Sequence, residues 1–145
     1  MPDQEGLTEM VLFATYCSAE KDAASGLLPA IDRYQSERIS GVCSGAKSAS
    51  ARFGILSGQY GLISADHPLP YYDHLLQVDQ IEEMAKRTQA TLVEWEITEV
   101  QWFSVAFEMD PNVKRYQSVM EEAAAQAGAA FHLTLWEPTG MLGLI

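Results

Sequence analysis

The chain has 145 residues, 48% of them apolar, a length and composition typical of one globular domain with a sizeable core. Twenty acidic residues outnumber nine basic ones, which gives a formal net charge of −11. Because phosphate contacts need clustered Lys and Arg, this charge argues against a free-standing binder of duplex nucleic acid. It is equally well explained as a source of solubility. We predict a single domain over residues 1–145.

The cysteines and the N-terminus indicate a reduced, cytoplasmic protein. Cys17 and Cys43 are the only cysteines, and neither lies in a CxxC or Cys/His ligand series. The first residues, MPDQEGLTE, lack the basic segment and apolar core of a secretory signal, and no apolar run is long enough to span a bilayer. We expect no cofactor and no metal, and a disulfide between the two cysteines stays open.

The first part of the chain predicts a strand, a loop and a helix. Residues 9–15 form an apolar run, too short for a surface helix, that ends at Tyr16-Cys-Ser-Ala-Glu-Lys21. Apolar residues then recur at helical spacing over residues 29–49. Gly41 and Gly45 are expected to break or weaken this helix.

The stretch Arg52 to Ile63, RFGILSGQYGLI, predicts a buried strand over residues 53–56 that runs into a turn punctuated by glycine. Gly58 and Gly61 allow a positive φ or a close approach of backbone. The turn is therefore expected to present polar side chains at the carboxyl end of the strand. These are Ser57, Gln59 and Tyr60.

The chain continues with a loop and a second helix. Two prolines stiffen the loop over residues 64–74, which is rich in side chains that can form hydrogen bonds. Apolar residues at helical spacing then mark one face of a helix over residues 78–92. A third strand is expected at residues 100–107.

The end of the chain predicts one more helix and strand. Asp110 before Pro111 is typical of a helix start, and Gly128 of a helix end. A fourth strand follows at residues 131–136. The apolar tail after it, residues 137–145, is expected to cover the core or to form the interface of a homodimer.

Strands alternating with helices predict an α/β three-layer sandwich with a mainly parallel sheet of about four strands. In such sheets, ligands bind at the carboxyl ends of the strands. The candidate site therefore collects the residues that follow the strands. They include Cys17, Ser18 and Lys21 after the first strand, with Tyr72 and Asp73 from the proline-rich loop above.

Cys17 is the candidate nucleophile. It directly follows an apolar strand, and a turn would bring the ammonium of Lys21 near its sulfur, which favours the thiolate. The alternative is that Cys17 is a small buried hydrophobe, as many free cysteines are. Cys43, on the apolar face of a predicted helix, is expected in the core.

The later loops suit a planar ligand. Tyr60, Tyr71 and Tyr72, beside Gln59 and Asp73, would enclose a planar ring and bind its polar edge, as proteins do with free or extruded bases. Tyrosines in such loops also cover their own core, and this reading stays open. The chain has no GxSxG elbow, no GxGxxG and no Walker loop, which argues against a serine hydrolase and the usual nucleotide sites.

Three segments carry a family resemblance: Cys17-Ser-Ala-Glu-Lys21, ILSGQYGLI at residues 55–63, and Tyr71-Tyr-Asp73. They resemble a group of small bacterial domains. Those domains look like the domain shared by archaeosine synthase and archaeal tRNA-guanine transglycosylase, whose fold is similar to uracil-DNA glycosylase. The resemblance covers about residues 11–76. It implies a uracil-DNA-glycosylase-like fold with a pocket for a purine or 7-deazapurine base.

The archaeosine synthase motif is matched in part. It reads proline, cysteine, three residues, then lysine-proline-tyrosine, with a serine and a histidine further on. Cys17 and Lys21 match it, whereas Tyr16 replaces the leading proline and Asp22-Ala23 replace the proline and tyrosine. The later serine and histidine positions are not matched.

The sequence thus predicts recognition or modification of a nucleobase or nucleoside-like ligand through a Cys17 thiolate, with Lys21 as its electrostatic partner. An enzyme of this kind would be a base-modifying transferase. The alternative is a non-catalytic binding or interaction module that keeps the fold without the chemistry. The ligand would be a free small molecule, or a nucleic acid base that a partner subunit delivers. The expected substrate contacts are Ser18, Ser57, Gln59, Tyr60, Tyr72 and Asp73.

Overall fold

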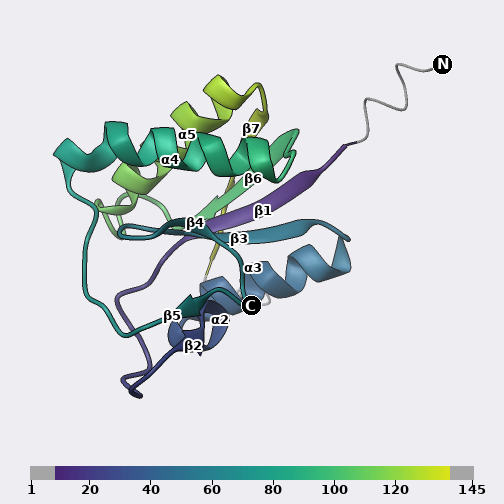
Figure 1. The fold of residues 1–145 in the computed structure, drawn as a ribbon. Helices are drawn as coiled ribbons and strands as arrows, with labels where there is room; N and C mark the ends of the chain where they lie inside the picture. Colours follow the sequence, from purple (N-terminus) through teal and green to yellow (C-terminus); the bar gives the residue numbers. More distant parts are fainter. Residues whose placement is uncertain (1–8, 138–145) are drawn as a thin grey trace.

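Five strands form the central sheet of the computed structural model, which describes residues 9–137 (Figure 1). In sheet order they are β4 (Gly61–Ile63), β3 (Arg52–Ser57), β1 (Val11–Tyr16), β6 (Glu99–Ser104) and β7 (Ala130–Leu135). β1 pairs in parallel with β3 and β6, and β6 with β7, whereas β4 is antiparallel to β3. The predicted α/β class and mainly parallel sheet are confirmed. The sheet has five strands because the expected turn after β3 is a hairpin.

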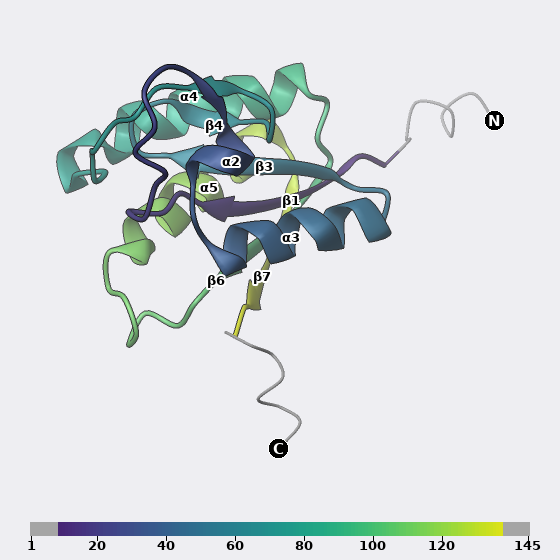
Figure 2. The same ribbon diagram turned by 90° about the horizontal axis from the view of Figure 1, so that it is seen from below.

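Helices cover both faces of this sheet (Figures 1 and 2). α3 (Glu37–Ser48) packs on one face against β1 and β3. α4 (Ile81–Glu94) and α5 (Val113–Ala127) pack against each other on the opposite face, α4 following the short 3-10 helix η1 (Val78–Gln80). Each connection between parallel strands therefore returns over one face of the sheet.

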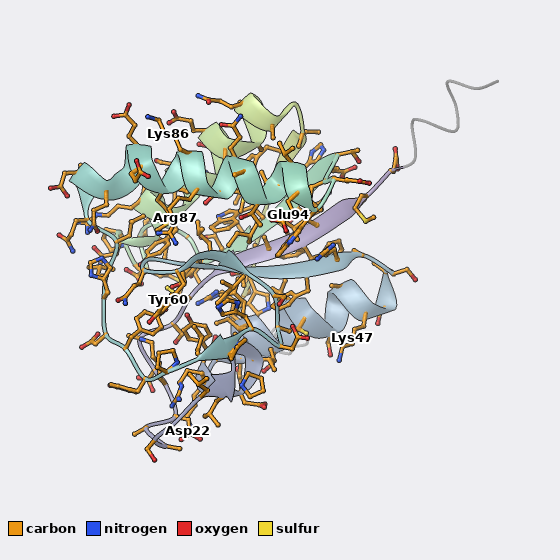
Figure 3. The ribbon with its side chains drawn as sticks, viewed as in Figure 1. Asp22, Lys47, Tyr60, Lys86, Arg87 and Glu94 are labelled. Carbon is orange, nitrogen blue, oxygen red and sulfur yellow. The ribbon has the colours of Figure 1, made fainter. Side chains whose placement is uncertain are left out.

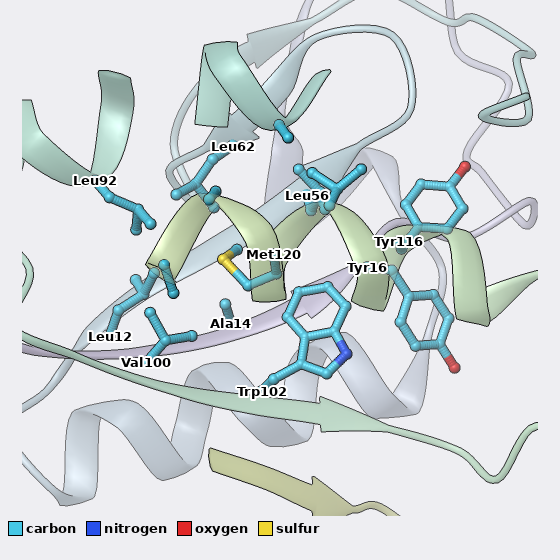
Figure 4. Close-up of a cluster of buried hydrophobic side chains, with 14 of the residues drawn as sticks. Leu12, Ala14, Tyr16, Leu56, Leu62, Leu92, Val100, Trp102, Tyr116 and Met120 are labelled. Carbon is cyan, nitrogen blue, oxygen red and sulfur yellow. The ribbon is translucent and has the colours of Figure 1, made fainter. Parts of the chain in front are cut away.

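The larger core cluster lies between the sheet and the helix pair α4 and α5 (Figure 4). Alternate side chains of β1 and β6 point to it, among them Leu12 and Tyr16 of β1 and Trp102 of β6. Trp102 and Met120 are fully buried. Because burial of one large apolar side chain contributes about 1.5–3 kcal/mol, this cluster is the main source of stability.

A second cluster lies on the α3 face of the sheet. Its buried members are Ala30, Tyr34, Ile39, Ile55, Ile63, Leu69 and Tyr72. A small antiparallel sheet of β2 (Leu28–Pro29) and β5 (Pro68–Leu69) contributes to it, beside the short helix α2 (Ala30–Arg33). The proline-rich loop therefore crosses this face before it reaches α4.

The single helix expected over residues 29–49 is two helices, α2 and α3. Tyr34 ends α2 in an extended conformation, and the Ser36 side chain accepts from the Ile39 N–H at 3.2 Å to cap α3. Gly41 and Gly45 lie inside α3. The prediction that they break the helix is wrong. The break lies before them, where the Ser36 side chain caps the start of a new helix.

The turn after β3 uses its two glycines in the two ways expected. Gly61 has a φ of +80°, and a Cβ on Gly58 would lie 2.7 Å from the Tyr116 hydroxyl. Gly128 ends α5 with a φ of 77°, as predicted. The helix itself begins at Val113 and not at Pro111, because the Val113 and Lys114 N–H groups bond three residues back, to Asp110 and Pro111.

The third predicted strand is shorter than expected. β6 ends at Ser104 and not at residue 107, because a turn at residues 107–109 follows it. The apolar tail at residues 138–145, with the dimer interface expected of it, lies outside the described residues. Within residues 9–137 no helix has the length and apolar character needed to cross a membrane.

Candidate functional site

The strand order places a crevice at the carboxyl ends of β1 and β6. The chain leaves β1 toward β3 on one side of the sheet and reaches β6 on the other side, so the order reverses at β1. Loops from this point diverge to opposite faces, which is where open α/β sheets bind ligands. A cavity of about 530 Å³ lies here. That volume is within the range of about 300–1,000 Å³ for small-molecule sites.

We call this space the Cys17 cavity. Its lining consists of residues 16–21, Arg38, residues 73–75, Val105, Met109, Asp110, Asn112, Val113 and Tyr116. The first group comes from the end of β1 and the residues after it, and Arg38 comes from the start of α3. The others come from the proline-rich loop, from the β6–α5 connection and from the start of α5. Four segments that lie far apart in the sequence therefore line one cavity.

The backbone of Cys17 is held at the carboxyl end of β1. Its N–H donates to the Leu56 carbonyl at 3.0 Å, which extends the β1–β3 pairing by one residue. Its side chain is half-buried and packs against both core clusters while lining the cavity. Cys17 and Cys43 are both free thiols, and Cys43 is buried, as expected.

Lys21 is held beside the cavity by aromatic rings. Its Nζ lies 4.7 Å from the centroid of the Tyr72 ring and 5.9 Å from that of Tyr34. Such cation–π contacts stabilise an ammonium without neutralising it. Across residues 9–137, the ion pairs of the structure do not include Lys21.

A chain of buried hydroxyl groups lies behind these rings. Ser57 Oγ accepts from the N–H groups of Gln59 and Tyr60 at 3.1 and 3.0 Å, so its hydrogen is left for Tyr72 Oη at 2.9 Å. The Tyr72 and Tyr34 hydroxyls share one further hydrogen bond. One phenol hydrogen of this pair therefore stays available as a donor.

Three phenols near Cys17 resist ionisation. Burial, and then the charge of the nearby Cys17 sulfur, raise the pKa of Tyr34, Tyr72 and Tyr116 above the usual range. They remain neutral hydrogen-bond donors at neutral pH. Cys17 thus lies close to these three phenols and to the Arg38 guanidinium.

We expect the protein to lose stability as the pH rises above about 10. The pKa of Tyr72 is 10.0 in an unfolded chain and higher in the fold, so the folded state holds this proton more tightly. The resulting stability is fully present below pH 10.0 and decreases as pH rises toward the folded pKa. Urea midpoints measured between about pH 8 and 11 should therefore fall less steeply in Tyr72→Phe. Exposed Tyr71→Phe is the matched control, and equal slopes in both variants would contradict this account.

Arg38 reaches the cavity from the first turn of α3. It is 8% exposed, and its guanidinium donates to Thr15 Oγ1, the Tyr16 carbonyl and the Cys17 carbonyl at 2.5, 2.7 and 3.2 Å. The same group stacks on the Tyr16 ring at 3.6 Å. Burial lowers the pKa of Arg38. Sequence reasoning missed this residue, although a basic side chain near a helix N-terminus opposes the helix dipole and signals another partner.

Tyr16 and Tyr116 form the inner wall. Their ring centroids are 6.1 Å apart, and both lie at one end of the larger core cluster (Figure 4). The Tyr16 hydroxyl accepts from the Val105 N–H at 3.4 Å and the Tyr116 hydroxyl from the Leu76 N–H at 3.0 Å. Each oxygen is thus positioned by backbone and keeps its own hydrogen to donate. Neither tyrosine was among the predicted site residues.

No family model, curated protein or solved structure matches this chain. The resemblance to uracil-DNA-glycosylase-like domains therefore stays a prediction. Within residues 9–137 the structure also contains no cluster of three His, Cys, Asp or Glu side chains suited to a metal ion.

A second cavity of about 350 Å³ adjoins the first, and we call it the Arg87 cavity. Its lining residues are Gly58, Gln59, His74, Asp79, Gln80, Glu83, Met84 and Arg87. Arg87 points from α4 to the β3–β4 turn, where it donates to the Gln59 carbonyl at 3.3 Å (Figure 3). His74 lines both cavities. Gln80 Oε1 accepts from the Gln77 N–H, so His74 Nε2 is a second donor to it, at 2.9 Å, and Nδ1 remains an acceptor.

The predicted site residues separate into three groups. Lining the Cys17 cavity are Cys17, Ser18, Lys21 and Asp73, while Gln59 lines the Arg87 cavity. Ser57, Tyr60 and Tyr72 line neither of these two cavities. Ser57 and Tyr72 are buried and belong to the chain of hydroxyl groups. The half-buried Tyr60 ring packs perpendicular to the Tyr72 ring, with the two ring centroids 5.1 Å apart. If Ser57, Tyr60 and Tyr72 affect binding, they do so through Lys21, whose ammonium lies over the Tyr72 ring.

Proposed function

We propose that the chain binds a small planar ligand of the nucleobase kind in the Cys17 cavity and that Cys17 acts on it as a nucleophile. One observation carries the proposal. A free cysteine, an ammonium without an ion-pair partner among residues 9–137 and two tyrosine rings line the same cavity at the reversal point of the sheet. Its volume suits one small ligand. The proposal includes a uracil-DNA-glycosylase-like fold, which the resemblance of residues 11–76 supports.

The chemistry proposed is addition of sulfur to an electron-poor ring carbon. The Cys17 thiol loses its proton, its sulfur forms a bond to that carbon, and the C=N π bond opens. The ring nitrogen receives the electron pair and takes up the proton that the thiol lost. Lys21, the proposed electrostatic partner of Cys17, lines the same cavity.

Recognition of the ring is proposed to use the polar rim of the cavity. Ser18 and Asp73 lie at the mouth and would bind donor groups on the ring edge. Tyr16 and Tyr116 supply flat apolar surface on the inner side, where a base can pack. The net charge of −11 favours a free ligand over a base within nucleic acid.

One observation also favours a second candidate, a binding module without chemistry. The Lys21 ammonium rests on the Tyr72 and Tyr34 rings, an arrangement that a structural contact alone would explain. A module of this kind would bind the same ligand without forming a covalent bond. The Cys17→Ala variant separates the two candidates.

A thermal-shift screen tests the proposal. The panel contains free bases, 7-deazaguanine derivatives, nucleosides and amino acids, measured on wild type, Cys17→Ala and the control Cys43→Ala. A ligand at about a hundred times its dissociation constant adds about 2.7 kcal/mol, or several degrees for a domain of this size. We expect shifts with base-containing compounds only. Shifts with amino acids alone, or with nothing, would contradict the proposal.

Alkylation of the native protein tests the nucleophile. Iodoacetamide should modify Cys17 in the folded state and modify the buried Cys43 only after unfolding, as followed by mass spectrometry. A bound ligand should protect Cys17. Cys17→Ala should lower the rate of any covalent turnover by several powers of ten. Unchanged ligand binding with no turnover in wild type would favour the binding module.

A further inference from the structure

We infer that the inner end of the Cys17 cavity binds an oxyanion of the ligand, a carboxylate or a phosphate, between Lys21, Arg38 and the Tyr116 hydroxyl. The inference rests on the proposed function in taking this cavity as the ligand site. It adds the chemical class of the ligand, which would be a planar ring that carries an anionic group.

Two cations of the Cys17 cavity, Lys21 and Arg38, have no ion-pair partner within residues 9–137. The chain carries a net charge of −11, yet neither Lys21 nor Arg38 belongs to the ion pairs found in residues 9–137. Arg38 is 8% exposed, and its three bonds go to neutral oxygen atoms. Asp110 attracts Arg38 from the same cavity but forms no ion pair with it. Because buried charges such as Arg38 are normally paired, and the half-buried Lys21 also has no ion-pair partner within residues 9–137, the cavity suits an anion.

Arg33 provides a comparison within the same chain. It is also buried without a carboxylate, but its five hydrogen bonds disperse the charge over four carbonyl groups. It lines neither the Cys17 cavity nor the Arg87 cavity. Arg38 differs in having fewer bonds and a cavity in front of it, so its remaining N–H groups are free to bind a ligand.

The second argument is the set of neutral donors beside these cations. Tyr116 is 4% exposed, and its oxygen already accepts from the Leu76 N–H, so its hydrogen is left to donate. Tyr16 is held in the same way by the Val105 N–H. Fixed hydroxyl donors next to positive charge form the environment that stabilises oxyanions.

The acidic residues of the cavity indicate how the bound ligand is oriented. Glu20 and Asp73 are exposed, and one Asp110 carboxylate oxygen accepts from the Asn112 N–H at 3.1 Å. The exposed acids would repel an anion at the mouth and accept hydrogen bonds from ring N–H groups there. The anionic group is therefore placed at the inner end and the donor edge of the ring toward solvent.

Calorimetric titration with matched pairs of ligands tests the inference. Uracil against orotate examines a carboxylate, and guanosine against guanosine monophosphate examines a phosphate. We expect the anionic member of at least one pair to bind about tenfold more tightly or better. The pair that shows the difference identifies the anion. Equal affinity within both pairs would overturn the inference and leave the proposed function standing.

Variants assign the effect to the cavity. Lys21→Met should weaken binding of the anionic member about tenfold more than binding of the neutral member, whereas the exposed Lys47→Met should change neither. Tyr116→Phe should act like Lys21→Met, and Cys17→Ala should keep the preference because the anion does not depend on the thiol. A Lys21→Met variant that weakens both members equally would contradict the inference.

A separate arm covers failure of the ring ligands. If no base-containing compound binds, the proposed function fails, and inorganic phosphate and acetate then serve as probes at matched ionic strength. Either ion should raise the melting temperature of wild type more than that of Lys21→Met. Equal shifts in the two proteins, or none, would overturn the oxyanion site as well.

Discussion

Replacement of Arg33 with methionine should lower the free energy of unfolding by about 3–5 kcal/mol. Arg33 is fully buried, and its guanidinium bonds to the carbonyls of Asp22, Ala24, Gly26 and Leu69 over 2.6–3.3 Å. Methionine fills a similar volume but donates nothing, so these carbonyls lose their partner. The loop from Lys21 to Gly26, whose first residue lines the Cys17 cavity, should loosen with it.

Urea unfolding followed by circular dichroism measures the change. Arg52→Met is the matched control, because Arg52 is exposed and only stacks on the Trp95 ring at 4.2 Å. It should cost less than about 1 kcal/mol. Similar losses in the two variants would show that the carbonyl contacts of Arg33 contribute nothing specific.

Replacement of Gly58 with alanine should cost about 2–3 kcal/mol and should also disturb the Cys17 cavity. An added Cβ would lie 2.7 Å from the Tyr116 hydroxyl, 3.0 Å from the Leu76 nitrogen and 3.2 Å from the His74 carbonyl oxygen. Two of these atoms are backbone atoms, and the Leu76 N–H bonds to the Tyr116 hydroxyl. They cannot move without displacing Tyr116 from the site, so ligand affinity should fall together with stability.

Gly45→Ala is the control for this substitution. Its added Cβ would meet the Phe13 ring at 3.8 Å, an ordinary contact, inside helix α3. Alanine is a better helix former than glycine by about 0.8–1 kcal/mol, so this variant should be as stable as wild type or more so. A Gly58→Ala protein with the same urea midpoint as Gly45→Ala would contradict the close approach at Gly58.

Local chemistry explains which parts of the fold were predictable. Apolar runs and turn residues marked β1, β3 and β7 close to their observed positions, and Gly61 and Gly128 were expected where a positive φ occurs. These features depend on neighbouring residues alone. The break between α2 and α3 was misplaced because several weak signals competed, and the Ser36 cap prevailed over the glycines of α3.

The site was predictable only as far as it follows the ends of strands. Cys17, Ser18 and Lys21 directly follow β1, so the general rule for open α/β sheets sufficed to select them. Ser57 was selected by the same rule, but the structure buries it under the Tyr72 hydroxyl. The rule identifies the edge of the sheet and does not distinguish inward from outward side chains.

The sequence by itself determined the α/β class, the positions of most strands and a cysteine at the carboxyl end of the first one. Only the tertiary structure decided the strand order, which places β6 beside β1 although Thr15 and Phe103 are 88 residues apart. It also decided that Arg38 and Tyr116 meet Cys17 in one cavity. The local sequence pattern determines whether a segment forms a helix or a strand. Which strands pair, and which side chains meet in one cavity, depends on burial that distant segments share, and no local pattern encodes this.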